Sequence, residues 1–316
     1  MKHIKYLSLS FLLLAGSGCE SLVKDINDNP NEISSDNFQA GVLLLKGMEL
    51  ANVSVQLGHQ TRIAGMWSGQ TRGVALLYKS IYEYNLSAEE TSSVWQNAYQ
   101  GVVKQARLLR EHTADSPKAA QYSGISKVIE ANAMGTIANL FGDVPYAEIS
   151  NDDIADPKFD SQKAVFGQLQ TLLDGAITDL GSAANTAVPE DLYLNGNTLK
   201  WAKVAYTLKA RMYMYTREYE KAYEAATKGI SAANEALTFT PPNIGNGSLN
   251  LNYKMINERG GYWAFTGGYL ETLMKKRNNA KTDETARLAY YRFDGNAANN
   301  NKGIAAPGRP MTLVGY

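Results

Sequence analysis

Two stretches of the chain concentrate aromatic side chains among glycines and polar residues. Residues 58–85 show no clean helical or strand period, and residues 262–269 place several rings between glycines. Flat rings stack on the apolar faces of sugar rings, while polar groups around them hydrogen-bond to the hydroxyls. The alternative interpretation of each aromatic side chain is that it packs in the hydrophobic core. We predict that the residues that contact a ligand are Trp67, Tyr82, Tyr262, Trp263 and Tyr269.

The side chains needed for common catalytic and metal chemistry are absent or isolated. Three histidines occur, and neither His59 nor His112 has a second ligand at metal-binding spacing. The sequence has no nucleophile elbow, phosphate-binding loop or dinucleotide-binding fingerprint. Because a catalytic carboxylate pair is defined by its separation in space, a surface hydrolase stays open as a third alternative. We therefore expect no catalytic residues, no metal site and no cofactor.

The only cysteine, Cys19, stands directly after a segment that resembles a secretory signal peptide. It follows a short basic segment, an apolar run over residues 6–15 and small residues at 16–18. This order is that of a secretory signal peptide, and the apolar run is too short for a permanent membrane span. A lone cysteine forms no intramolecular disulfide. We predict that residues 1–18 are a lipoprotein signal peptide and that Cys19 is lipidated, with an incidental cysteine after an ordinary signal as the alternative.

The balance of charge argues against one class of partner. The 316 residues include 31 basic and 31 acidic side chains with interspersed signs. A chain without a basic stripe lacks the positive patch with which proteins bind nucleic acid. Polar residues 19–36 predict a tether, which leaves residues 37–316 as one domain long enough to bury a sizeable core.

The aromatic stretches must be positioned by helices, because helical periodicity dominates the rest of the domain. Apolar residues recur at three- and four-residue spacing. The predicted helices cover residues 37–57, a segment from Ser92 or Ser93 through Leu109, a segment from Ser116 through Leu140, residues 162–180 and a pair over residues 198–230.

The last of these pairs is the most repeat-like part of the chain. Large and small residues alternate in it as they do in tetratricopeptide helix pairs, where small residues permit close approach. The residues that follow this scheme are Tyr206, Ala210, Tyr213, Ala222 and Ala226. The predicted fold is therefore all-α: a tetratricopeptide-like helical repeat scaffold with irregular Gly/Asn/Tyr-rich segments that face the ligand.

One helix ends in a specific motif. Gly142 can take the left-handed cap conformation, and Pro145 keeps the residue before it extended, so the helix stops there. Residues 140–146, LFGDVPY, resemble the signature of the SusD/RagB family, which are surface nutrient-binding lipoproteins of Bacteroidetes-type outer membranes. Other segments resemble the family as well: residues 25–31 after the anchor, residues 94–99 at a helix start, and residues 200–203 with 208–211 in a second hallmark helix. In the second of these, Gln96 and Asn97 point off the apolar stripe, from where they could touch ligand.

The resemblance implies a function and partners. The protein would sit at the cell surface, held to the outer membrane by a lipid anchor, and bind an oligosaccharide or peptide nutrient. It would deliver that nutrient to a TonB-dependent, SusC-like outer-membrane transporter, without catalysis. The alternative is a helical-repeat scaffold lipoprotein that assembles envelope proteins, against which the aromatic stretches count. Since family members continue with further helices, we expect the C-terminal part of the domain to be missing after Tyr316.

Overall fold

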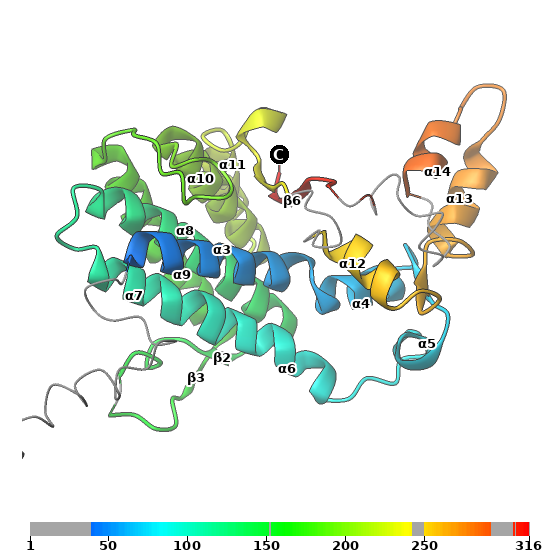
Figure 1. Ribbon diagram of the computed structural model, residues 1–316, viewed down its shortest axis with the longest axis horizontal. Coiled ribbons are helices and arrows are strands. Elements are labelled where there is room, and N and C mark those ends of the chain that lie inside the picture. The colour runs from blue at the N-terminus through cyan, green and yellow to red at the C-terminus, as the bar shows by residue number, and fades with distance from the viewer. Residues whose placement is uncertain (1–38, 152, 242–249, 292–305, 307, 316) are drawn as a thin grey trace, which may run out of the picture. The chain divides into compact units, whose positions relative to one another are not determined.

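Helices make up most of the computed structural model, which describes residues 39–151, 153–241, 250–291, 306 and 308–315 (Figure 1). The predicted signal peptide, Cys19 and the tether lie outside these residues. In chain order the helices are α3 (Ala40–Leu57), α4 (His59–Trp67), α5 (Leu76–Tyr82), α6 (Glu89–Gln96), the π-helix η2 (Asn97–Lys104), α7 (Gln105–His112), α8 (Ala119–Phe141), α9 (Gln162–Ser182), α10 (Thr198–Tyr215), α11 (Tyr219–Ala226), the 3-10 helix η3 (Ala233–Glu235), α12 (Leu251–Glu258), α13 (Tyr269–Arg277) and α14 (Thr285–Tyr291).

Long helices pack side by side in one region, which we call the helical scaffold (α3, η2 and α7–α11). The helix α8 is its centre, because it contacts α3, α7, α9 and α10, while α11 packs on α10. Burying each large aliphatic side chain contributes about 1.5–3 kcal/mol. The fully buried side chains of this core include Leu45, Met48, Ile125, Ile129, Ile137, Leu169 and Leu173.

The helix-ending motif closes α8 as predicted. Gly142 ends the helix with φ +79° and ψ −115°, a positive-φ conformation outside the predicted left-handed α region that strains any residue with a Cβ. The strand β2 (Val144–Pro145) follows and pairs antiparallel with β3 (Phe159–Asp160). Oδ1 of Asp143 then accepts the backbone N–H of Gln162 at 2.8 Å, at the start of α9. The motif therefore sets the connection between α8 and α9.

Tyr146, the last residue of the motif, ends in a buried ionic network. Its hydroxyl donates to Oε1 of Glu130 at 3.0 Å. The Glu130 carboxylate also accepts from Arg107 at 3.0 Å and from Arg110 at 2.8 Å, so two guanidinium groups compensate a desolvated charge. Burial, then the Glu130 charge, raises the pKa of Tyr146, which is therefore a neutral donor. The family motif thus has a structural role and ties the α8–α9 connection to α7.

Short strands join segments that are far apart in the sequence. The strand β1 (Arg72–Gly73) pairs antiparallel with β5 (Trp263–Ala264), and β4 (Leu237–Phe239) pairs antiparallel with β6 (Met311–Val314). These two-stranded sheets are a small departure from the all-α prediction. They arise because the irregular segments need partners for their backbone N–H and C=O groups once they are buried.

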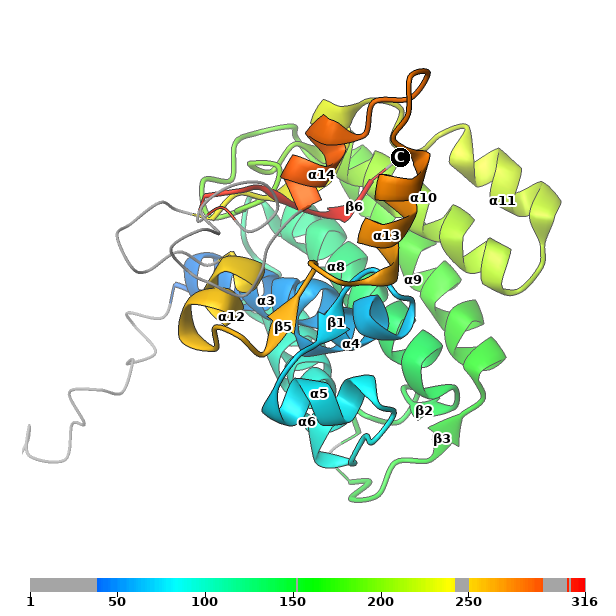
Figure 2. The same cartoon turned by 90° about the vertical axis from the view of Figure 1, so that its right-hand side faces the viewer.

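The β1–β5 pair brings the two aromatic stretches together. Helices α4 and α5, from early in the chain, lie beside α12, α13 and α14, from late in the chain (Figures 1 and 2). We call α4, α5, α12–α14, β1 and β5 the aromatic region. One hydrophobic cluster forms its core: Ile63, Met66, Tyr78, Ile81, Ile256, Trp263, Phe265 and Met274.

Three details differ from the predicted helices. The helix expected to begin at Ser92 or Ser93 begins at Glu89, where two acidic residues in the first turn interact favourably with the helix dipole. The helix expected from Ser116 begins at Ala119, because the Ser116 hydroxyl accepts the N–H of Lys118 in a preceding turn. In α11 the buried small residues are Ala222 and Ala225, not Ala226. Among the described residues, no helix combines the length and apolar character needed to span a membrane.

Candidate functional site

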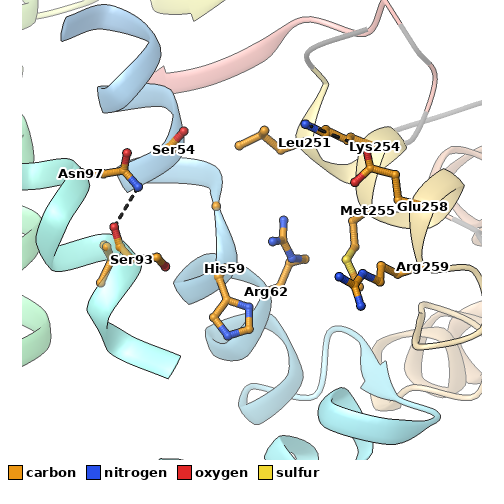
Figure 3. Close-up of a pocket in the computed structure, with 12 residues that line it drawn as sticks. Ser54, His59, Arg62, Ser93, Asn97, Leu251, Lys254, Met255, Glu258 and Arg259 are labelled. Carbon is orange, nitrogen blue, oxygen red and sulfur yellow. Dashed lines mark hydrogen bonds and ion pairs between the residues drawn. The ribbon is translucent and has the colours of Figure 1, made fainter. Parts of the chain in front are cut away.

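A pocket of about 310 Å³ lies between the α3–α4 junction, the α6–η2 segment and α12 (Figure 3). Its walls come from two segments that are far apart in the sequence, residues 54–97 and 251–259. For this reason no single sequence motif indicated the pocket. The side chains with charged or hydrogen-bonding groups in its lining are Ser54, His59, Arg62, Ser93, Asn97, Lys254, Glu258 and Arg259.

Gly58 makes the junction between α3 and α4 possible. A Cβ built on this residue would lie 2.2 Å from the carbonyl oxygen of Ser54, so a side chain cannot be accommodated without moving the backbone. The α4 helix begins directly afterwards and runs from His59 to Trp67. Gly58 thereby allows the end of α3 and the start of α4 to line the same pocket.

Asn97 enters the pocket from a π-helical segment. The helix from Glu89 to His112 is continuous, but Asn97–Lys104 within it has the wider π-helical geometry, which is rare and recurs at functional sites. The Asn97 amide donates to the carbonyl oxygen of Ser93 at 2.8 Å, the dashed line in Figure 3. Asn97 therefore lines the pocket as its position off the apolar stripe suggested, whereas Gln96 does not.

His59 forms a fixed wall of the pocket. Its Nδ1 lies 3.0 Å from the Tyr78 hydroxyl and its Nε2 lies 2.8 Å from Oε2 of Glu90. Burial lowers the pKa of His59 below its usual value, and the hydrogen bond to Glu90 only partly opposes this. A neutral ring fits both contacts, with Nε2–H donating to Glu90 and Nδ1 accepting from Tyr78. Both ring nitrogens are thus already engaged.

Cationic side chains stand on the two facing walls. Arg62 on α4 donates through Nε to the Tyr78 hydroxyl at 2.8 Å, and Figure 3 shows its guanidinium directed into the space between α4 and α12. On the other wall, the Arg259 guanidinium lies 6.0 Å from the ring centroid of Tyr262. Nζ of Lys254 is 3.9 Å from Oε1 of Glu258. The pocket is therefore polar, with apolar contributions from Val94, Leu251 and Met255.

Three of the five predicted ligand-contacting aromatics are exposed near the C-terminal end of α4. Trp67 ends this helix and donates through Nε1 to the carbonyl oxygen of Ile81 at 2.8 Å. Tyr82 follows Ile81, and both Trp67 and Tyr82 are 39 % exposed. Tyr269, 66 % exposed, packs on Gly69 just beyond α4, where a Cβ would lie 3.0 Å from its own Cβ.

Tyr84 joins these rings, although the predicted set omits it. Its ring centroid is 5.5 Å from that of Trp67 with an interplanar angle of 31°, and its side chain is 72 % exposed. The only sequence signal for it is its place in the first aromatic stretch. We call Trp67, Tyr82, Tyr84 and Tyr269 the aromatic platform.

Tyr262 and Trp263 occupy different surroundings. Trp263 is 5 % exposed, belongs to the hydrophobic cluster and donates through Nε1 to Oγ1 of Thr71 at 2.8 Å. The structure places it in the core, so its ring presents no open face and we leave it out of the binding surface proposed below. Tyr262 packs against the same cluster and borders the pocket through its contact with Arg259.

The pocket and the aromatic platform lie at opposite ends of α4. The helix has nine residues, and at 1.5 Å rise per residue His59 and Trp67 are separated by about 12 Å along its axis. Over the described residues, no group of three or more His, Cys, Asp or Glu side chains is placed to hold a metal ion. The arrangement offers hydrogen-bonding and charged groups at one end of a helix and exposed rings at the other.

Comparison with known families agrees with this architecture. Residues 37–281 match the SusD-like family, described as starch-binding and associating with the outer membrane. This match covers well more than half of the 316-residue chain, so the chain belongs to the SusD-like family. The resemblance stated from the LFGDVPY motif is confirmed, and so is the mainly helical fold.

Solved structures of the same family share the fold. A SusD/RagB family protein of Bacteroides thetaiotaomicron is 22 % identical with a TM-score of 0.65, over 76 % of this chain and 51 % of its own. A chitin-binding SusD homologue of Flavobacterium johnsoniae is 16 % identical with a TM-score of 0.65, over 86 % and 63 %. A second SusD-like protein of B. thetaiotaomicron is 20 % identical with a TM-score of 0.62, over 87 % and 62 %. The chain thus spans between half and two thirds of the length of these three structures. No functionally curated protein matches the sequence.

Proposed function

We propose that this protein binds a glycan at the cell surface without catalysis and delivers it to a TonB-dependent, SusC-like outer-membrane transporter. The observation that carries the proposal is the arrangement along α4, with a polar pocket at one end and the aromatic platform at the other. A sugar ring has an apolar face and a rim of hydroxyls, so an oligosaccharide presents partners for both.

The chemistry of the pocket supports binding without turnover. Glycosidases need two carboxyl groups, at separations of about 5–9.5 Å, on either side of the scissile bond. Among the described residues that line the pocket, Glu258 is the only acid. Glu90 in α6, which does not line the pocket, is engaged by His59. We therefore propose a binding protein and not a hydrolase.

Membership of a family that associates with the outer membrane supports the proposed location. In this proposal Cys19, which lies outside the described residues, carries the lipid that anchors the chain, and residues 19–36 tether the domain to it. Replacing Cys19 by serine is expected to release the protein from the membrane fraction. Retention of the Cys19→Ser protein in that fraction would contradict the anchor.

Glycan binding is tested by calorimetric titration of the protein with chito- and malto-oligosaccharides. Trp67→Ala and Tyr269→Ala are each expected to weaken binding about two- to tenfold, since a lost aromatic contact is worth about 0.5–1.5 kcal/mol. Tyr223→Ala is the matched control, because Tyr223 is 73 % exposed on α11 and distant in sequence from both pocket and platform. Equal affinity of all three variants would remove the platform from the site.

Partnership with a transporter is tested by pull-down of the tagged protein from solubilised outer membranes of its own host. Co-purification of a large TonB-dependent barrel is the expected result. Recovery of other envelope proteins, together with no affinity for any glycan, would instead support the scaffold lipoprotein.

A further inference from the structure

The pocket at the start of α4 concentrates positive charge. Three cations line it, Arg62, Lys254 and Arg259, against the single carboxylate of Glu258 among the described lining residues. The chain as a whole has equal numbers of basic and acidic side chains. The excess in the pocket is therefore local. Arg62 is half-buried whereas Lys254 and Arg259 are exposed, and like charges around one recess add to the field that a ligand meets there.

Both arginines are oriented by contacts that leave guanidinium nitrogens available. Arg62 uses Nε for the hydroxyl of Tyr78, which is buried, so the planar group is held at one end and directed into the pocket (Figure 3). Arg259 lies over the Tyr262 ring, a contact that orients the guanidinium without using its N–H groups. A pre-oriented guanidinium binds carboxylate or sulfate oxygens through two parallel hydrogen bonds.

The acidic residues near the pocket do not neutralise this arrangement. Glu258 is 3.9 Å from Lys254, on the same helix face and largely exposed, and such pairs are worth little in water. Glu90 is bound to His59 and is not part of the lining. The two arginines thus keep a net positive field directed at whatever fills the pocket.

We propose that the pocket selects a glycan with an anionic substituent, either the carboxylate of a uronic acid or a sulfate ester. Arg62 and Arg259 bind the anion from the two walls, Lys254 adds to the field, and Asn97 hydrogen-bonds to a neighbouring hydroxyl. The neutral sugar units of the glycan extend along α4 to the aromatic platform. This inference rests on the proposed glycan-binding function and adds the class of glycan.

The test uses two pairs of oligosaccharides that differ only in charge. One pair is an oligogalacturonate and its methyl ester, and the other is a sulfated galactan oligosaccharide and its desulfated counterpart. The charged member of one pair is expected to bind at least about tenfold more tightly, because a charge-assisted hydrogen bond contributes about 1.5–3 kcal/mol. This preference should shrink as salt is raised, through screening. Whichever pair shows it identifies carboxylate or sulfate as the ligand group.

Variants assign the preference to the pocket. Arg259→Gln and Lys254→Gln are expected to reduce the preference for the charged member, measured as the ratio of the affinities of the charged and the neutral member, about tenfold and a few-fold respectively. Glu258→Gln is expected to increase the preference, a change of opposite sign from the same helix. Lys79→Gln on α5 is the control, since Lys79 is an exposed lysine paired with Glu83 and does not line the pocket.

The outcomes separate this inference from the function on which it rests. If the charged and neutral members of both pairs bind equally well, or if only neutral glycans bind, selection of an anion is wrong and glycan binding stands. If the protein, with an unchanged circular dichroism spectrum, binds no charged or neutral oligosaccharide, the proposed function fails and this inference fails with it.

Discussion

The helical scaffold and the aromatic region are held together in different ways. Scaffold helices α3, α8, α9 and α10 have 18 to 23 residues. Helices α8, α9 and α10 pack mainly on their neighbours in the sequence, whereas α3 packs on η2, α7 and α8. Helices α4, α5, α12, α13 and α14 have only 7 to 9 residues. Helices this short have little stability of their own and depend on tertiary contacts.

The hydrogen bonds that join the two halves of the aromatic region bridge most of the chain. Trp263 donates to Thr71 across 192 positions, and Arg72 donates to the carbonyl oxygen of Thr266 across 194 positions at 2.8 Å. Local opening free energies are not uniform within a fold, and short helices that depend on distant partners open more easily than long packed ones. We infer that the scaffold sets global stability, whereas the aromatic region can loosen by itself.

The largest effect is expected in the scaffold. Trp201→Ala removes a fully buried ring from α10 and its Nε1 hydrogen bond to Asp191 at 2.7 Å. The free energy of unfolding, measured with denaturant, should fall by about 3–5 kcal/mol. Leu199→Ala on the same helix is the control, because Leu199 is exposed and its loss should change stability by less than about 0.5 kcal/mol. A fall of equal size in both variants would contradict the assignment of Trp201 to the scaffold core.

A smaller and more local effect is expected for Thr71→Val. The substitution removes the acceptor that Trp263 Nε1–H uses, at a cost of about 1–3 kcal/mol for a buried donor. Amide hydrogen exchange should accelerate in α4 and α13 and stay unchanged in α8, while ligand affinity falls. Thr178→Val on the exposed side of α9 is the matched control. Faster exchange in α8 as well would mean that the two regions do not open separately.

Two glycine substitutions should act in opposite directions within the scaffold. Gly142→Ala places a Cβ on a residue with φ +79° and ψ −115°, where space is open but the backbone conformation costs about 1–3 kcal/mol. Gly167→Ala, in the interior of α9 and equally free of close neighbours, should stabilise the protein by about 0.8–1.0 kcal/mol through helix propensity. Thermal unfolding of both variants checks this. A shift of the same sign in both would rule out backbone conformation as the cause.

The two regions should also differ in how their stability depends on pH. Burial, then the Asp191 charge, raises the pKa of Glu49 in α3 well above 4.5, so the folded state keeps a proton that the unfolded state releases. Scaffold stability should therefore fall as pH rises from 4.5. Burial lowers the pKa of His59 below 6.5, so the unfolded state takes up the proton first and stability should fall as pH drops below 6.5. Glu49→Gln and His59→Gln should each abolish one of these two slopes in denaturant titrations, and an unchanged slope would contradict the corresponding assignment.

The sequence predicted the scaffold well because its helices are long enough to show their period. Residues 162–180 were expected to be amphipathic, and α9 buries Phe166, Leu169 and Leu173 behind an N-cap at Ser161. Gly142 and Pro145 predicted the end of α8, because the backbone conformations that glycine and proline favour are local properties. These features need no knowledge of distant parts of the chain.

The site was predictable only in part, because burial in the aromatic region is decided by distant partners. Nothing near Trp263 in the sequence reveals that Thr71 and the α4 side chains cover it, whereas Trp67 is left exposed. Arg62, Lys254 and Arg259 were missed because charged residues in short segments are normally solvated. Only tertiary contacts between distant segments, among them the β1–β5 pair and the hydrophobic cluster, bring α4 and α12 to the same pocket.

The π-helical segment η2 has a consequence for how the two regions are aligned. The continuous helix from Glu89 to His112 enters the pocket at Asn97 and the scaffold core at Ala106 and Leu109. Because η2 has π-helical and not α-helical geometry, deleting one residue within Asn97–Lys104 would change the rotation of the start of this helix relative to α7. The direction of Asn97 would then change, and so would the packing of Ala98, which is buried in the scaffold next to it. The residues of η2 thus determine how the start of this helix is rotated relative to the scaffold. A single insertion or deletion there would change the orientation of Asn97 in the pocket.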